Sequence, residues 1–296
     1  MNFIDKIKKK IVLLIIIAIS ALVFSFLSIF ILSAYRASKI EPVKIAPPLE
    51  ETAILLEGWT IENIDQYFKE RAKWQGDEFF LAAGYKNVYN KANKQEFARD
   101  FSKEFSFLID KPENLSLEGY LFPDTYRLFA SSTPEEIIIK MLSNFDKKLT
   151  PEMRADIKAS GKTIHEIITM ASIIEKEAPI YAQTDSEAAK IISGIFWNRI
   201  KIGMGLQSDA SLSYIYDDNK PIHSGEELEV DSLYNTYKYR GLPPGPIANP
   251  GLIAIKAAIY PSETNYYYFL TTLDGSAIYY AKTYEEHLRN KYKYLK

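Results

Sequence analysis

An uncharged apolar run near the amino terminus constrains this chain more than any other feature of its sequence. Residues 11–34 carry no charged side chain, and a helix of about 24 residues is long enough to span the hydrocarbon core of a bilayer. A cleaved signal peptide is the alternative, and the small pair Ser33 and Ala34 would suit a cleavage site, but the apolar core of a signal peptide is shorter. We therefore expect an uncleaved transmembrane anchor.

The charges that flank this run predict its orientation. A basic tail with four lysines, residues 1–10, precedes the run, whereas only Arg36 and Lys39 follow it closely. The positive-inside rule then places the amino terminus in the cytoplasm. The predicted location is the cell (inner) membrane, crossed once, with the folded part of the chain on the extracytoplasmic side.

The rest of the chain divides into three parts. Residues 35–50 contain three prolines and no periodic apolar pattern, which is typical of an extended linker. Residues 51–112 form a small module, and residues 113–296 form a larger domain. Apolar periodicity and capping residues predict helices at 61–68, 77–83, 133–144, 163–178, 184–200, 252–259 and 284–294, and strands at 53–56, 266–272 and 277–281. Residues 117–128 are predicted as strand and turn around Gly119, Pro123 and Asp124. This segregated order of helices and strands indicates an α+β fold.

Composition excludes several classes of function. The net charge is −2, from 36 basic and 38 acidic residues, so the chain lacks the overall positive charge that nucleic-acid binding needs. It has no cysteine, and its three histidines show no metal-ligand spacing, so we expect neither a metal site nor thiol chemistry. Nucleotide-binding loops and the zinc-protease and serine-hydrolase motifs are absent, so no cofactor is expected.

Glu175 stands out because the helical pattern around it turns its carboxyl group inward. In the predicted helix 163–178, which opens with Thr163 and Glu166 in capping-box spacing, Glu175 lies about 20° from both Ile164 and Ile168. The same geometry places Glu177 about 140° from Ile164, facing water. Apolar surroundings favour the neutral form of a carboxyl group, so Glu175 has the setting of a general acid.

Two alternatives remain for this helix. An inward glutamate is also found where it pairs with an arginine or a buried amide, with no role in catalysis. Ser172 and Lys176 have the spacing of a serine–lysine nucleophile, but Lys176 points about 120° away from Ile164, toward solvent. Acid catalysis therefore suits the chain better than nucleophilic catalysis.

A loop rich in tyrosine, proline and glycine, residues 234–251, is a candidate for sugar binding. Aromatic rings stack on sugar faces, and amides and carboxylates bind hydroxyl groups. The alternative is that Tyr234, Tyr237 and Tyr239 only pack a long loop.

Four separated stretches resemble one known family. They are LEGYLFPDTYRL at 117–128, ASIIEKEA at 171–178, FWNRIKIGMGLQSD at 196–209, and YNTY with GLPPGPIANPG between 234 and 251. In this order they are similar to the MltG or YceG-like family of endolytic murein transglycosylases. The resemblance covers the chain from about residue 51 to its end, and several motifs in order are far more specific than one.

The resemblance implies roles for individual residues. The first glutamate of the EKE motif is the catalytic acid/base of the family, and Glu175 has that position here. Five further residues are implied to bind substrate in or beside the glycan cleft: Glu118, Gln207, Asp209, Asn235 and Tyr237. The alternatives are that Glu118 and Asp209 cap loops or form ion pairs, and that Asn235 satisfies backbone groups of its own turn.

The resemblance also implies a reaction. It is endolytic cleavage of the β-1,4 bond between N-acetylmuramic acid and N-acetylglucosamine in nascent glycan strands, which leaves a 1,6-anhydro end and terminates elongation. The implied partners are peptidoglycan strands and peptidoglycan synthases. Two other functions stay open: a non-catalytic peptidoglycan-binding or divisome scaffold, and a murein hydrolase that uses Asp209 as its second carboxylate.

The small module departs from the family pattern. Residues 51–112 resemble the LysM-like part that precedes the catalytic domain, but the short linker leaves no room for the first lobe that many family members carry. Glycan binding by this reduced LysM-like module is therefore open, and the membrane anchor would replace part of its function.

Overall fold

The protein is described from a computed structural model that covers residues 3–38, 49–86, 99–177, 186–218, 220, 223–272 and 275–295. The chain forms two units, Met1–Pro48 and Leu49–Lys296. The first contains helix α1 (Phe3–Ser38), which by length and composition is able to cross a membrane. This helix is longer than the predicted anchor and extends into both the predicted tail and the predicted linker. Residues 39–48 of that linker lie outside the described residues.

The second unit begins with a strand that pairs across a long stretch of sequence. Strand β1 (Glu50–Ile54) runs antiparallel to β2 (Thr125–Phe129), with Thr52 opposite Arg127. The ladder joins segments on the two sides of the predicted boundary at residue 112, and both belong to the same compact unit. The division into two folded parts stays a prediction.

Between these strands lie helices α2 (Ile61–Lys69) and α3 (Glu78–Ala83), followed by the 3₁₀ turns η1 (Phe101–Lys103) and η2 (Ser106–Leu108). A capping box fixes the start of α2, because Thr60 and Asn63 each bond the other's backbone. The predicted apolar face of this helix is confirmed, since Ile61, Ile64 and Phe68 are buried. Both predicted helices of this region are present.

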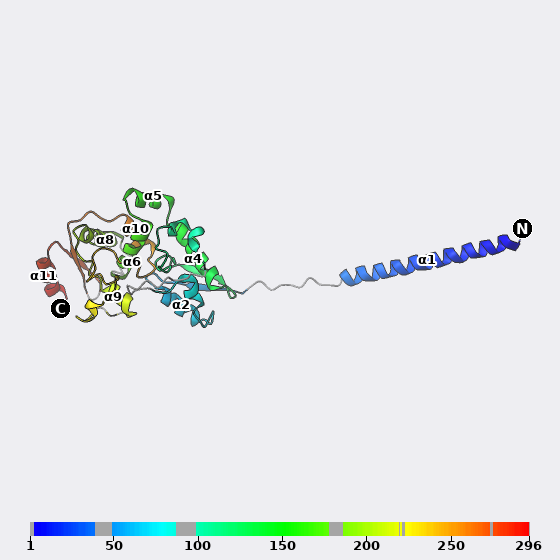
Figure 1. Ribbon diagram of the computed structural model, residues 1–296, viewed down its shortest axis with the longest axis horizontal. Coiled ribbons are helices and arrows are strands. Elements are labelled where there is room, and N and C mark those ends of the chain that lie inside the picture. Colours follow the sequence, from blue (N-terminus) through cyan, green and yellow to red (C-terminus); the bar gives the residue numbers. More distant parts are fainter. Residues whose placement is uncertain are drawn as a thin grey trace. The chain divides into compact units, whose positions relative to one another are not determined.

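The remaining elements of the unit are helices with one short hairpin (Figure 1). In chain order they are α4 (Pro134–Lys148), α5 (Pro151–Ala159), α6 (Ile164–Glu177), α8 (Ser186–Lys201), α9 (Asp209–Tyr216), η3 (Glu227–Glu229), α10 (Leu252–Ile259), β3 (Tyr268–Thr271), β4 (Ile278–Ala281) and α11 (Tyr284–Tyr294). Strands β3 and β4 pair antiparallel. The described residues of the second unit therefore form a mixed α+β fold, and an apolar helix precedes it in the sequence.

Helix α6 is the centre of this unit. It packs against α5, α8, α9 and α10, and every side chain from Ile167 to Glu175 is buried. A one-sided amphipathic helix was expected, but neighbours cover it on all sides. The polar residues of its other face tolerate this burial because they bond the helix's own backbone: Thr169 Oγ1 donates to His165 O at 2.8 Å, and Ser172 Oγ to Thr169 O at 2.8 Å.

Most of the predicted helices are confirmed, and two helices were missed. The predictions for α10 and α11 match the observed bounds, and Thr133 and Glu136 form the capping box that starts α4. The helices α5 and α9 were not predicted. Thr184, the first residue of the predicted helix 184–200, and Asp274, between the predicted strands 266–272 and 277–281, lie outside the described residues.

Candidate active site

Glu175 lies in the last turn of α6, where this helix meets the start of α10. Its side chain is 1% exposed, which confirms the inward orientation. The Gly251 N–H donates a hydrogen bond of 3.0 Å to Glu175 Oε2. Gly251 is the N-cap of α10, so the carboxyl group sits at the partially positive end of that helix. A buried amide is thus one partner of Glu175, and the helix end stabilises negative charge at this position.

A tight turn at Glu57 and Gly58 covers the same carboxyl group. A Cβ atom built on Gly58 would lie 3.5 Å from Glu175 Cγ and 3.7 Å from Lys176 Cδ. The φ angle of Gly58 is +77°, a conformation that glycine adopts without strain. Its N–H donates to Asn249 O at 2.9 Å, which ties the turn to the loop before α10.

Glu118 is buried in the wall of the site and joins three segments. Its Oε2 accepts a hydrogen bond from Ile61 N at 3.2 Å, and its Oε1 accepts one from Asn249 Nδ2 at 3.0 Å. Asn249 Oδ1 in turn accepts from Gly119 N and Leu121 N. Burial raises the pKa of Glu118 well above its usual value, and the nearby charge of Glu62 adds to this. These contacts describe a residue that positions loops.

Glu177 does not face water as predicted. Its side chain is half-buried, and its carboxylate accepts a hydrogen bond from Ser208 Oγ. Burial raises the pKa of Glu177, with a further contribution from the charge of Asp209. The helical wheel was wrong here because the segment that leads into α9 crosses the end of α6, and the sequence did not predict α9.

The LQSD motif (206–209) and the YNTY motif (234–237) lie against each other near the end of α6. Gln207 N donates to Thr236 O at 3.2 Å, and Ser208 N to Thr236 Oγ1 at 2.9 Å. The Tyr237 hydroxyl donates to Asp209 Oδ1 at 3.1 Å. Burial raises the pKa of Tyr237, and the charge of Asp209 raises it further. Three predicted site residues are thus brought together.

Gln207 and Asn235 differ in their exposure and in their contacts. Gln207 is exposed and has a φ angle of +50°, a conformation that a residue with a side chain rarely adopts and that clusters at functional sites. Asn235 is 0% exposed, and its Nδ2 donates to Leu228 O and Val230 O. Its Oδ1 accepts from the backbone of Tyr237 and Lys238. In this arrangement Asn235 orders the turn that presents Tyr237.

The serine–lysine alternative gains no support from the structure. Ser172 is fully buried, and its hydroxyl donates to Thr169 O and accepts from Ile247 N at 3.0 Å. Its oxygen is committed to backbone groups. Among the described residues there is also no group of three histidine, cysteine or acidic residues that could hold a metal ion.

Two of the pockets in the second unit bear on the position of the site. One of about 360 Å³ borders the end of α6 at Lys176, the start of α2 at Thr60 and Asn63, and α9 at Ser213 and Tyr214. Its lining includes Lys176, the residue after Glu175, and Ala210, the residue after Asp209, but none of the predicted site residues themselves.

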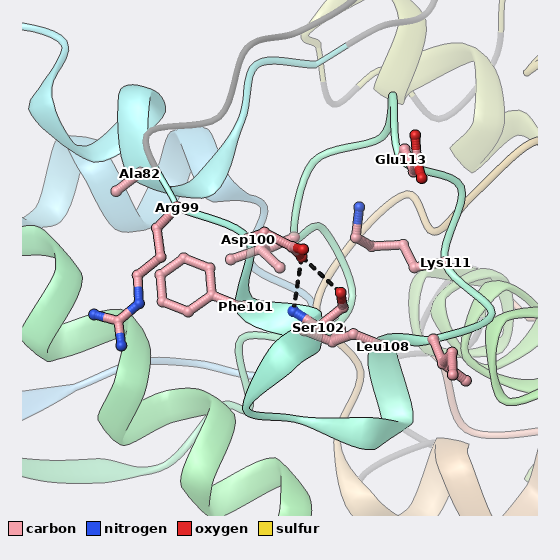
Figure 2. Close-up of a pocket in the computed structure, with 10 residues that line it drawn as sticks. Ala82, Arg99, Asp100, Phe101, Ser102, Leu108, Lys111 and Glu113 are labelled. Carbon is pink, nitrogen blue, oxygen red and sulfur yellow. Dashed lines mark hydrogen bonds between the residues drawn. The ribbon is translucent and has the colours of Figure 1, made fainter.

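The other pocket, of about 550 Å³, is lined by none of the predicted site residues (Figure 2). Asp100 accepts two hydrogen bonds from Ser102 there. Burial lowers the pKa of Lys111 to about 8, while its ammonium group donates to Pro112 O and Leu115 O. Asp100 and Lys111 are thus engaged in ordering the loops that line this pocket.

Comparison with known proteins identifies the family of this chain. The model of the YceG-like family matches residues 38–293, which is most of the chain. The chain belongs to the YceG-like family. A crystal structure of a yceG-like protein from Listeria monocytogenes has a TM-score of 0.68 with this fold at 31% sequence identity, and covers 83% of this chain and 76% of that one.

Two curated relatives carry a functional name. The chain is 36% identical over 215 residues to a protein of Bacillus subtilis named endolytic murein transglycosylase, covering 71% of this chain and 58% of the relative. It is 33% identical over 261 residues to a Streptococcus pneumoniae protein of the same name, covering 82% of this chain and 44% of the relative. The chain spans about half the length of these curated relatives.

Sequence reasoning missed three residues around Glu175. Sequence analysis did not single out Glu57, placed Asn249 only within the loop 234–251, and expected Glu177 in solvent. Two glycines could have pointed to them: Gly58 follows Glu57, and Gly251 lies two residues after Asn249. Glycine often marks a close approach of two segments.

Proposed function

We propose that this chain is a membrane-anchored endolytic transglycosylase of peptidoglycan, with Glu175 as its catalytic acid/base. The observation that carries the proposal is the buried Glu175 carboxyl group at the start of α10, in a chain of the YceG-like family. The name of the curated relatives supports the same reaction. The substrate is the β-1,4 bond between N-acetylmuramic acid and N-acetylglucosamine in nascent strands.

A single carboxyl group performs both proton transfers of this reaction. Glu175 donates its proton to the glycosidic oxygen, and the bond between that oxygen and the anomeric carbon breaks. The carboxylate then takes the proton of the C6 hydroxyl as that oxygen attacks the anomeric carbon. Glu175 is protonated again, the muramyl sugar carries a 1,6-anhydro ring, and no water is consumed. The Gly251 N–H stabilises the intermediate carboxylate.

The other predicted site residues divide by their contacts. Gln207, Asp209 and Tyr237 are proposed to contact glycan, since the first is exposed and the last two are partly accessible. Glu118 and Asn235 are proposed to act by holding the walls of the cleft, because their polar atoms bond backbone and amide groups of this chain.

The remaining parts of the proposal concern location and partners. Helix α1 would anchor the protein in the cell (inner) membrane in a single pass, with the amino terminus in the cytoplasm, and hold the enzyme at strands as they emerge. Residues 51–112 would act as a reduced LysM-like module beside the catalytic domain, residues 113–296. Peptidoglycan synthases are the proposed protein partners, because they supply the nascent strands.

Mass spectrometry of digested glycan tests the function. Purified uncrosslinked strands are incubated with the protein and with the variant Glu175→Gln. Internal fragments with 1,6-anhydro ends, produced only by the wild type, are expected. Reducing ends, one water heavier, would show a hydrolase instead, and strands bound by folded protein but left intact would show a scaffold.

A further inference from the structure

Glu57 brings a second carboxyl group next to Glu175. A Cβ atom built on Gly251 would lie 1.9 Å from Glu57 Oε1, and the N–H of the same glycine bonds Glu175 Oε2 at 3.0 Å. Standard backbone dimensions then place the two carboxyl groups within about 7.5 Å of each other, on two sides of Gly251. The two residues are far apart in sequence and come from different elements.

The contact with Glu57 accounts for the absence of a side chain at position 251. Its φ and ψ angles are −76° and 172°, which any residue adopts, so its backbone conformation does not require glycine. A side chain there would collide with three atoms of the Glu57 carboxyl end, Oε1, Cδ and Cγ. Gly251 therefore gives Glu57 the space to approach Glu175.

Glu57 is also held in place while its carboxyl group stays available. The next residue, Gly58, is tied to Asn249 O, and Asn249 bonds Trp59 O through both its backbone N–H and its Nδ2. Glu57 itself is half-buried and makes no hydrogen bond or ion pair with any described residue. Burial raises the pKa of its carboxyl group. A carboxyl group fixed in a turn, partly desolvated and not engaged by the chain has a free face for a ligand.

We propose that Glu57 is a second catalytic residue, which contacts the sugar at Glu175 and stabilises the positive charge that develops on its anomeric carbon. This inference rests on the proposed function. Glu57 acts as a carboxylate, because the positive charge that develops on the sugar favours its ionised form and opposes the effect of burial. It forms no bond and takes no proton, since Glu175 performs both proton transfers. A preorganised negative charge beside an oxocarbenium-like transition state acts on turnover more than on binding.

Steady-state kinetics of full-length protein in detergent micelles, with uncrosslinked glycan strands, test the role. Glu57→Gln keeps the size of the side chain and removes its charge. We expect kcat to fall about 100-fold with KM changed less than about threefold, and the residual products to keep 1,6-anhydro ends. Glu70→Gln is the matched control, since Glu70 is exposed at the end of α2, and it should turn over like the wild type.

Several outcomes separate the two proposals. If wild type cleaves and folded Glu57→Gln cleaves equally fast, the role of Glu57 is overturned while the proposed function stands. A rise in KM with unchanged kcat would assign Glu57 to binding only and would also overturn it. If wild type leaves strands intact, the proposed function fails and the role of Glu57 fails with it. If Glu57→Gln does not fold, Glu57→Asp replaces it in the assay. A reduced kcat at the wild-type KM then supports the role of Glu57, and a wild-type kcat overturns it.

Discussion

Two buried glutamates in this fold, Glu175 and Glu118, have nearly the same exposure and different surroundings. They are 1% and 3% exposed. Glu118 uses its two oxygens to tie the start of α2 to the loop before α10. Glu175 lies at the start of α10, under a glycine turn that carries another carboxyl group. Burial alone therefore does not identify a catalytic acid, and the neighbours of the carboxyl group do.

The largest expected effect comes from removing the proton of the proposed acid. Glu175→Gln should lower turnover of glycan strands by about 1,000-fold or more, because both proton transfers depend on this group. Folding should be retained, since an amide fills the same space, and circular dichroism checks it. Glu118→Gln is the control and should keep most of its turnover per folded molecule. An equal loss in a folded Glu118→Gln protein would remove the distinction between the two glutamates.

The next effect concerns stability and is expected at the other glutamate. Glu118→Ala leaves the buried Ile61 N–H and the Asn249 amide without their acceptor, which should lower the free energy of unfolding by about 2–4 kcal/mol. Urea unfolding of the fragment 49–296 measures this. Glu70→Ala, at an exposed site, should change it by less than about 0.5 kcal/mol. A loss no larger than that of the control would show that the ties of Glu118 do not stabilise the fold.

The pH dependence of stability provides a finer distinction. The folded pKa of Glu118 is raised above its ordinary value of 4.5, so its stabilising contribution is complete below that value and is lost as pH rises through the folded pKa. Glu118→Gln cannot ionise and should lack this decline. The gap in unfolding free energy between wild type and Glu118→Gln should therefore shrink between pH 4 and pH 8.

The pKa values of Glu57 and Glu177 are raised in the same direction, but these residues are present in both proteins, so their contributions cancel in the difference. Urea titrations at several pH values give the two curves. Parallel curves would show that Glu118 has the same pKa in the folded and unfolded states.

The smallest expected effect is at the edge of the site. Tyr237→Phe removes the hydroxyl that donates to Asp209, and should lower kcat/KM by roughly two- to tenfold, the worth of one hydrogen bond. Kinetics on glycan strands measure it, with the exposed Tyr292→Phe as control. A loss as large as that of Glu175→Gln would give Tyr237 a part in the chemistry itself.

Short-range signals account for the elements that were predicted. Capping residues and apolar spacing mark α2, α4, α6 and α11, and both kinds of signal act within one or two turns of helix. The missed helix α9 has eight residues and no side-chain hydrogen bond at its N-cap, so the capping signal is absent there. The missed helix α5 does have Thr150 and Pro151 at its start, a signal that was present and not used.

The sequence by itself determined the apolar amino-terminal helix, the start of α6 and the inward direction of Glu175, because each depends on residues near one another in the chain. Tertiary structure decided which carboxyl groups share the site. Glu57 and Glu175 both contact Gly251, and Ser208 donates a hydrogen bond to Glu177. These contacts form only when loops from distant parts of the chain pack around α6. A helical wheel describes one helix, whereas the chemistry of a buried carboxyl group depends on the segments that surround it.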